Sequence, residues 1–230
     1  IWNIFGKKSN NHKSNSKLGL RMVEEGLITE EQLRAALKEQ KGNPEMLGQI
    51  LLAKGLVSEE QLQERLPEDN NIIAPKNLEE LNSPEFSDLY RLQTQIKFAL
   101  FSDRPLKTVL FTSGLPGEGK TVCSSFMGII TALALGKRVV LLDADLRRPS
   151  LHRFFHYYNA FGLTDVLIGS WPLEKAFRAT KFRNLKVITS GSHATNPAQL
   201  LSSTAMEDLL GQLVRRFDYI FIDCSPVLIA

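Results

Sequence analysis

Apolar and polar positions near the start of the chain follow a pattern that occurs twice. Residues 17–40 begin Lys-Leu-Gly and continue with Val-Glu-Glu-Gly-Leu-Ile-Thr-Glu-Glu-Gln-Leu, whereas residues 46–66 begin Met-Leu-Gly and continue with Leu-Ala-Lys-Gly-Leu-Val-Ser-Glu-Glu-Gln-Leu. The glycines of the two copies keep a constant offset of 29 residues, as Gly26 and Gly55 show. Self-similarity at a fixed spacing indicates a duplicated structural unit.

Each copy is expected to fold as two helices joined by a glycine turn. Thr29 precedes two glutamates and Gln32, the arrangement of a capping box that opens a helix, and Ser58 with Gln61 repeats it. The glycine before each box follows a helical run, which it can end in a left-handed turn. Leucines four residues apart then share one helical face: Leu33 with Leu37, and Leu62 with Leu66.

A linker is expected after the repeat because prolines stand among Asn and Glu residues, at Pro67, Pro75 and Pro84. This places a domain boundary near residues 70–85. Residues 90–101 then read as an amphipathic helix.

Three short apolar runs in the second half of the chain predict buried strands, at residues 108–112, 138–142 and 219–222. Residues 122–135 form a mostly apolar helical segment, which Gly136 ends. We therefore expect an α/β fold in which helices flank a mainly parallel sheet, preceded by a small all-α domain built from the repeat.

The first predicted strand runs directly into Ser-Gly-Leu-Pro-Gly-Glu-Gly-Lys-Thr at residues 113–121, the pattern G-x-x-x-x-G-K-T between a strand and a helix. Such a loop turns backbone N–H groups toward phosphate oxygens, and the positive end of the helix assists. Lys120 is expected to reach the β and γ phosphates and Thr121 to offer its hydroxyl to Mg²⁺. Three glycines allow the turn: Gly114, Gly117 and Gly119.

Acidic residues stand at the ends of the other two predicted strands. Asp143 and Asp145 close the second strand, and Asp223 closes the third. Two carboxylates near a strand end can share a metal and its waters. Because parallel strands bring their carboxyl ends to one crevice, the acids and the phosphate loop together predict a site for a magnesium nucleotide.

Composition narrows the class of protein without identifying it. With 230 residues, 43% hydrophobic and 23% charged, the chain has enough apolar mass for a packed core. Cys123 and Cys224 lack the number and spacing of a disulfide framework or a zinc site, so a reducing, cytoplasmic compartment is expected. No run approaches the roughly 18 apolar residues of a membrane span. The net charge of +3 reflects the lysines of residues 1–17, and no nucleic acid partner is expected.

The motifs jointly resemble the cytoplasmic catalytic domain of bacterial tyrosine kinases, the P-loop kinases associated with capsule and exopolysaccharide synthesis. Their Walker A, second Walker A and Walker B motifs correspond to the three segments that begin or end the predicted strands. Residues 162–169 and 196–202 agree as well. The resemblance covers about residues 83–230. Chromosome-partitioning and cell-division ATPases carry a second Lys early in the loop, which Leu115 and Pro116 replace.

The resemblance implies an ATP-dependent, autophosphorylating protein-tyrosine kinase that regulates exopolysaccharide or capsule synthesis or export. It implies Mg²⁺ at Thr121, Asp145 and Asp223, with Asp143 as the base, and it leaves open an exchange of roles between Asp143 and Asp145. Phosphoryl transfer needs mainly positioning and charge neutralisation, which Lys120 and Mg²⁺ would supply. ATP contacts are implied for Gly114, Gly117, Glu118, Gly119, Lys120, Thr121 and Val122.

The family also implies a membrane-embedded polysaccharide co-polymerase as activator, and hence recruitment to the inner face of the plasma membrane. Family members form rings through Glu-x-x-Arg-x-x-Arg, where this chain has Asp88, Arg91 and Thr94, so a homo-oligomer is left open. The tyrosine-rich tail of the family is not reached by residue 230, which predicts a C-terminally truncated kinase. A partitioning-type ATPase switch or a chain-length regulator without tyrosine transfer is one alternative, and a cyclic di-GMP-responsive adaptor is another.

The repeat resembles the tandem motif in the N-terminal domain of type II secretion and type IV pilus assembly ATPases, some of which bind cyclic di-GMP. Those members use an Arg before the Leu-Gly of each motif, where this chain has Lys17 and Met46. A docking module is the favoured interpretation, and cyclic di-GMP binding at residues 17–66 is the alternative. Four segments are expected: a disordered basic tail over 1–16, the helical module over 17–69, a linker over 70–85 and the P-loop kinase-like domain over 86–230.

Overall fold

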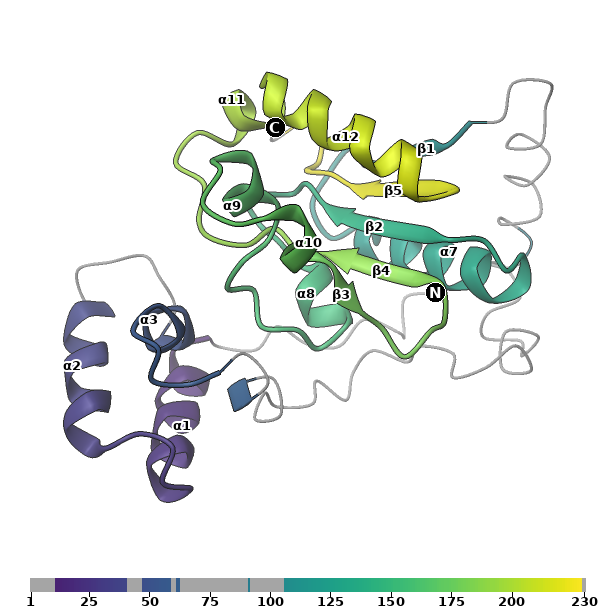
Figure 1. Ribbon diagram of the computed structural model, residues 1–230. Coiled ribbons are helices and arrows are strands. Elements are labelled where there is room, and N and C mark those ends of the chain that lie inside the picture. The colour runs from purple at the N-terminus through teal and green to yellow at the C-terminus, as the bar shows by residue number, and fades with distance from the viewer. Residues whose placement is uncertain (1–10, 41–46, 59–60, 63–90, 92–105, 229–230) are drawn as a thin grey trace. The chain divides into compact units, whose positions relative to one another are not determined.

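The computed structural model describes residues 11–40, 47–58, 61–62, 91 and 106–228, and the chain divides into two compact units (Figure 1). One unit contains the helices of the repeat and the other contains a β-sheet with its flanking helices. The predicted linker over 70–85 lies outside the described residues, as does the predicted helix over 90–101 apart from Arg91.

The repeat folds as predicted in the described residues. Helix α1 spans Asn11–Glu24, α2 spans Glu30–Gln40 and α3 spans Leu47–Ala53. The turns after α1 and α3 use Gly26 at φ +72° and Gly55 at φ +66°, a backbone region that favours glycine. Helix α1 begins six residues before the predicted module, so the expectation of a disordered tail over 1–16 is wrong for residues 11–16.

Both capping boxes are formed. The Thr29 N–H donates to Gln32 Oε1 at 2.7 Å, and the Gln32 N–H donates back to Thr29 Oγ1 at 3.2 Å. In the second copy the Ser58 N–H donates to Gln61 Oε1 at 2.8 Å, and the Gln61 N–H donates to Ser58 Oγ at 3.1 Å. Each box supplies side-chain oxygens to two backbone N–H groups at the start of a helix, where the helix itself offers these groups no acceptor.

Among the described residues, the second unit is built on a five-stranded sheet in the order β1-β5-β2-β4-β3. Its first four strands in this order are parallel, and β3 pairs antiparallel with β4 at one edge. The strands span Thr108–Phe111 (β1), Val139–Asp143 (β2), Arg178–Ala179 (β3), Leu185–Ile188 (β4) and Tyr219–Asp223 (β5). The predicted α/β class with a mainly parallel sheet is confirmed.

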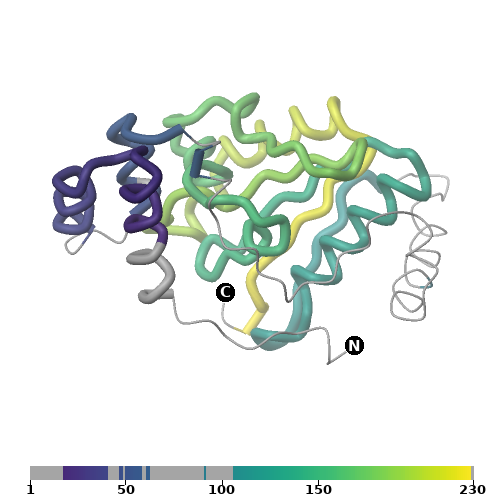
Figure 2. The backbone as a smooth tube through the Cα atoms, turned by 90° about the horizontal axis from the view of Figure 1, so that it is seen from below, coloured from purple at the N-terminus to yellow at the C-terminus, as the bar shows by residue number. Residues whose placement is uncertain are grey.

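Helices cover both faces of the sheet (Figures 1 and 2). Helix α7, Lys120–Ala134, packs on one face, where a Cβ atom at Gly128 would lie only 2.9 Å from Leu141 of β2. The other face packs against α9, α10 and α12 through one buried apolar cluster. Among the described residues of this unit, the other helices are α8 (Leu151–Phe154), α9 (Leu163–Leu167), α10 (Leu173–Ala176), α11 (Pro197–Leu201) and α12 (Thr204–Arg216).

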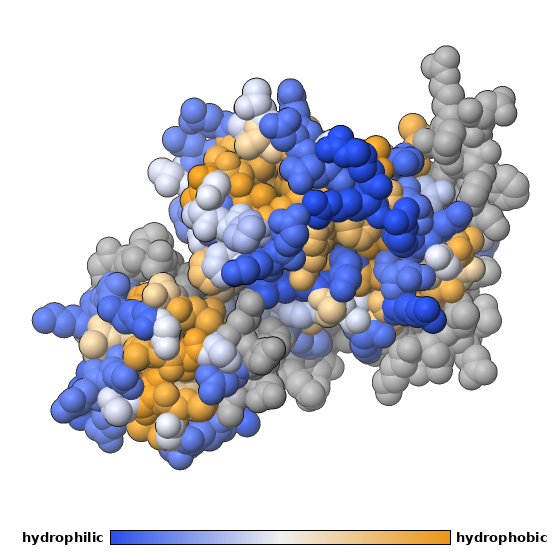
Figure 3. Space-filling model, in the orientation of Figure 1, coloured by the Kyte–Doolittle hydropathy of each residue, from blue (hydrophilic) through white to orange (hydrophobic). Residues whose placement is uncertain are grey.

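The sequence of helix α12 explains which side of this helix packs on the sheet. Met206, Leu209 and Leu213 lie three and four residues apart and are buried on the sheet. Hydrophilic side chains cover the outer side of this helix (Figure 3). Within the described residues, none of the helices combines the length and the apolar character needed to cross a bilayer.

Candidate nucleotide-binding site

The loop between β1 and α7 has the backbone that its glycines predict. Gly117 has φ +83° and Gly119 has φ +87°, values that side chains rarely tolerate. The Leu115 N–H donates to the Glu118 carboxylate at 3.1 Å, and Ser113 Oγ donates to the Leu115 carbonyl at 2.9 Å. The loop is therefore held by its own side chains, and α7 begins directly after it at Lys120.

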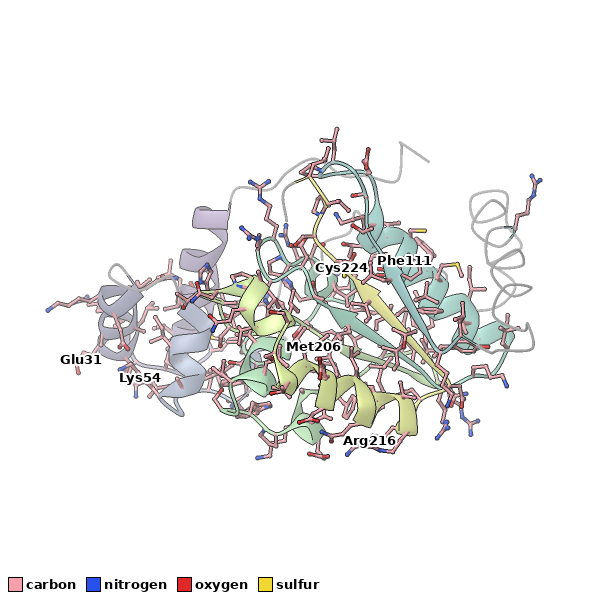
Figure 4. The ribbon with its side chains drawn as sticks, turned by 90° about the horizontal axis from the view of Figure 1, so that it is seen from above. Glu31, Lys54, Phe111, Met206, Arg216 and Cys224 are labelled. Atoms are coloured by element: carbon pink, nitrogen blue, oxygen red, sulfur yellow. The ribbon has the colours of Figure 1, made fainter. Side chains whose placement is uncertain are left out.

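The carboxyl ends of β1, β5 and β2 meet beside this loop. In the sheet register Asp223 of β5 pairs with Phe111 of β1 on one side and with Asp143 of β2 on the other. Past the strand end, the Cys224 N–H donates to the Phe111 carbonyl at 3.0 Å, and the two residues lie together in Figure 4. The Val227 N–H donates to the Ser113 carbonyl at 2.9 Å. The segment after β5 is thus fastened to the start of the phosphate loop.

Asp223 faces the first turn of α7. It is fully buried, and its Oδ2 accepts a short hydrogen bond from the Thr121 hydroxyl. Its Oδ1 is buried without a hydrogen-bond partner among the described residues. Burial raises the pKa of Asp223 to about 6, although the Thr121 hydrogen bond and the Lys120 charge oppose that rise.

Asp143 anchors the segment that follows β2. Its Oδ1 accepts the Asp145 N–H at 3.2 Å, and its Oδ2 accepts the N–H groups of Ser150 at 3.2 Å and Leu151 at 3.0 Å. The side chain has no exposed surface. Burial, followed by the charge of Asp223, raises the pKa of Asp143 to about 8. Both carboxylate oxygens are therefore committed to the local backbone.

Asp145 has a different environment two residues later. It retains 6% exposure, and its Oδ1 accepts the Arg148 N–H at 3.0 Å and the Ser225 hydroxyl at 2.7 Å. The Ser225 contact joins the segment after β2 to the segment after β5. Sequence reasoning missed Ser225, because only the folded sheet brings it to Asp145; its position just after a strand-ending acid was the available signal.

The donor set fits a hydrated Mg²⁺. A buried carboxylate oxygen without a partner, on Asp223, stands on the residue that also contacts the Thr121 hydroxyl. In the described part of the chain no three His, Cys, Asp or Glu side chains gather so as to hold a metal ion on their own. Mg²⁺ in proteins keeps several waters and binds one or two carboxylates together with substrate phosphates, which the Asp223 carboxylate beside the Thr121 hydroxyl can accommodate.

The other residues predicted for the site are more exposed than the three aspartates. Lys120 and Val122 are half-buried in the first turn of α7, whereas Gly114 and Glu118 are exposed in the loop. Arg91 is exposed, while Asp88, Thr94, Met46 and the Lys17 side chain lie outside the described residues.

The two further segments of the kinase resemblance each contain a short helix, and the first is joined to the loop that follows β4. Residues 162–169 contain α9, and residues 196–202 contain α11. Asp165 is buried, and its carboxylate accepts the Gly162 N–H at 2.8 Å, the Ser192 N–H at 3.0 Å and the Ser192 hydroxyl at 2.6 Å. Asp165 thus fastens the start of α9 to the loop that follows β4.

Comparison with known proteins identifies the family of this site. The model described as an AAA domain matches residues 107–230. Tyrosine-protein kinase YwqD of Bacillus subtilis (strain 168) is 39% identical over 158 residues, a match covering 69% of this chain and 65% of the relative. Tyrosine-protein kinase ptk of Acinetobacter johnsonii is 38% identical over 157 residues, covering 68% of this chain and 21% of the relative.

A solved structure agrees with these relatives. The kinase domain of Escherichia coli tyrosine kinase ETK matches with a TM-score of 0.60 at 28% identity, covering 75% of this chain and 68% of that one. The chain spans 65% of YwqD and 21% of ptk. The predicted relationship to bacterial tyrosine kinases is confirmed, while the resemblance of residues 17–66 to secretion ATPases stays a prediction. Since the family model covers more than half of the chain, this protein belongs to the AAA domain family.

Proposed function

We propose that the chain carries the catalytic domain of an ATP-dependent protein-tyrosine kinase that phosphorylates itself and regulates exopolysaccharide or capsule synthesis or export. The observation that supports this most directly is the contact between Thr121, at the start of the helix after the phosphate loop, and Asp223, at the end of the neighbouring strand. A P-loop hydroxyl beside a strand-ending acid is the arrangement that positions a metal-bound triphosphate.

In this proposal the loop N–H groups and the Lys120 ammonium hold the phosphates of ATP, while Thr121 and Asp223 hold Mg²⁺ and its waters. Mg²⁺, when bound, neutralises the charge that develops on the transferred phosphoryl group. The left-handed glycines Gly117 and Gly119 hold the loop backbone in this shape. Preorganised donors of this kind lower the barrier without reorganising during the reaction.

The sequence left open whether Asp143 or Asp145 acts as the base. The contacts of these two acids, which lie two residues apart at the end of β2, favour Asp145. Asp143 is fully buried and holds three backbone N–H groups. Asp145 retains 6% exposure, and its hydrogen bonds to the Arg148 N–H and the Ser225 hydroxyl both use Oδ1. We therefore assign Asp145 to accept or direct the proton of the acceptor tyrosine, and Asp143 to position the segment that carries it.

The test is phosphotyrosine formation by the full chain. The purified protein is incubated with ATP and Mg²⁺, and phosphotyrosine is detected by antibody and located by mass spectrometry. We expect a signal that Lys120→Ala abolishes and that Lys186→Ala, which changes an exposed lysine on β4, leaves intact. ATP hydrolysis with no phosphotyrosine on any peptide would overturn the kinase proposal in favour of a partitioning-type switch or a chain-length regulator.

The proposed activator is a membrane-embedded polysaccharide co-polymerase that recruits the kinase to the inner face of the membrane. Support comes from ptk, a relative in which the matched segment is only 21% of a much longer protein. A membrane fraction containing such a partner should increase phosphotyrosine formation. No change in the rate, or in sedimentation with the membranes, would contradict this part of the proposal.

For the repeat we propose a protein-docking module, with cyclic di-GMP binding as the alternative. A Cβ atom at Gly19 would meet Leu33, and one at Gly48 would meet Leu62, so the glycine of each Leu-Gly pair is explained by packing alone. Calorimetric titration of the full chain with cyclic di-GMP separates the two. No heat of binding supports docking, whereas saturable heat that Lys17→Ala reduces overturns it.

A further inference from the structure

The Ser150 hydroxyl lies 2.7 Å from the Thr121 hydroxyl oxygen, although 29 residues separate them in the chain. Ser150 precedes α8 and occupies the position where a serine ordinarily caps its own helix. Its side chain makes no such capping bond. Instead, Asp143 accepts the N–H groups of Ser150 and Leu151. The Ser150 hydroxyl is thereby available for a contact outside its own helix.

The direction of the hydrogen bond between the two hydroxyls follows from the number of protons. Thr121 has a single hydroxyl proton, and it donates this proton to Asp223 Oδ2. Ser150 must therefore donate to Thr121 Oγ1. The result is a directed chain of hydrogen bonds from Ser150 to Thr121 to Asp223, which leaves one lone pair of the Thr121 oxygen unassigned.

We propose that Ser150 is a positioning residue for the Mg²⁺ of the bound nucleotide, an inference that rests on the proposed nucleotide site. Its hydroxyl fixes the rotation of the Thr121 hydroxyl, so that the unassigned lone pair is available to the metal while the Thr121 proton stays directed at Asp223 Oδ2. The partnerless Oδ1 of Asp223 lies on the same carboxylate. The oxygens of Ser150, Thr121 and Asp223, on three separate chain segments, are thus oriented together.

The same contact ties the metal site to the segment after β2. That segment carries Asp145 and is anchored at both ends by Asp143, through the N–H groups of Asp145 and Ser150. Ser150 therefore connects the oxygen that meets the metal with the segment that bears the proposed proton acceptor. A displacement of one is transmitted to the other through a single pair of hydroxyls.

The test measures how strongly nucleotide binding depends on Mg²⁺, which requires no catalysis. Binding of a fluorescent ADP to the full chain is titrated in EDTA and at increasing Mg²⁺ for wild type, Ser150→Ala and Ser150→Thr. Ser202→Ala is the matched control, since the Ser202 hydroxyl only donates to carbonyls of its own helix turn. Circular dichroism melting confirms that each variant is folded.

We expect Ser150→Ala to raise the Mg²⁺ concentration at half-maximal binding by about three- to tenfold, the effect of losing one hydrogen bond to a metal ligand. Its ADP affinity in EDTA should stay within about twofold of wild type, and Ser150→Thr should restore the Mg²⁺ dependence. An unchanged Mg²⁺ dependence overturns the proposal. An equal loss of affinity with and without Mg²⁺ also overturns it, because a purely structural residue would act in that way. A wild-type chain that binds magnesium ADP but forms no phosphotyrosine contradicts the kinase proposal alone.

Discussion

Gly19 lies so close to Leu33 that a Cβ atom at Gly19 would come within 2.5 Å of Leu33 Cδ1. In the second copy of the repeat a Cβ atom at Gly48 would also crowd the corresponding leucine, at 2.9 Å from Leu62 Cδ2, although the Tyr158 ring lies nearer. The duplication therefore preserves a packing contact as well as a sequence motif. The glycine is the residue that lets two helices approach, and the leucine four positions after the capping threonine or serine fills the gap.

Gly19→Ala should destabilise the module by about 1–3 kcal/mol, because the added methyl overpacks a filled contact. The measurement is amide hydrogen exchange in α1 and α2. Gly211→Ala is the control, since that helical glycine of α12 has no atom nearer to a Cβ than Arg215 Nη1 at 3.9 Å; it should be neutral or stabilising by up to about 1 kcal/mol. In Leu33→Ala the cost of Gly19→Ala should shrink, and equal costs in both backgrounds would contradict the contact.

Substitution of the two acids after β2 should separate positioning from proton transfer. Asp145→Asn is expected to lower the phosphorylation rate by about 100-fold or more while leaving nucleotide affinity and melting temperature nearly unchanged. Asp143→Asn places an amide N–H₂ group against backbone N–H groups and should destabilise the fold by about 1–3 kcal/mol. Single-turnover phosphorylation and urea unfolding measure the two effects. Full activity in Asp145→Asn would return the base role to Asp143.

His152 should make the unfolding free energy depend on pH. Burial, together with the Arg153 charge, lowers its pKa from the ordinary 6.5 to about 3, and its Nδ1 is buried without a partner in the described region. The folded protein therefore keeps His152 neutral, so its contribution to stability is present above pH 6.5 and is lost as the pH falls toward 3. Between pH 6.5 and 5 the loss should be about 2 kcal/mol.

Urea unfolding at several pH values tests this dependence. His152→Gln should remove most of the slope between pH 6.5 and 5, whereas His193→Gln, at an exposed histidine, should retain it. The same slope in wild type and His152→Gln would assign the acid sensitivity to other groups.

Cys123 and Cys224 should alkylate slowly in the folded protein. Burial and the charge of Asp223 raise the pKa of Cys123, and burial with the neighbouring Asp223, Asp145 and Asp143 raises that of Cys224 to about 12. Since the thiolate is the reactive form, both thiols should react with iodoacetamide at pH 8 at least tenfold more slowly than in urea. Mass spectrometry of timed samples measures the rates. Fast labelling of either cysteine in the native protein would contradict its burial.

Local signals in the sequence predicted the elements whose causes are local. The phosphate loop, the capping boxes at Thr29 and Ser58, and the strands ending at Asp143 and Asp223 depend on residues within a few positions of one another. The antiparallel strand β3 and helices α8 to α11 have two to five residues each, which is too short for an apolar period to emerge. The start of α1 at Asn11 was missed because Asn, Ser and Lys carry no apolar stripe.

In the candidate site, the sequence pattern alone did not determine the role of each residue. The spacing of Asp143 and Asp145 indicated a shared site, but burial of Asp143 and its three N–H partners decide which acid holds the backbone. The contacts of Ser150 to Thr121 and of Ser225 to Asp145 cross 29 and 80 residues, so no local pattern predicts them. Serines are common, and only the fold selects these two.

The position of β5 in the sheet has a consequence for synthesis of the protein. This strand is the last of the five along the chain, yet it lies between β1 and β2, which have no pairing with each other. On the ribosome, β1 therefore has no partner in this sheet until more than a hundred later residues have emerged. The phosphate loop is therefore synthesised before Asp223. The ability to hold a magnesium nucleotide should arise in a single step, when β5 enters the sheet, rather than gradually.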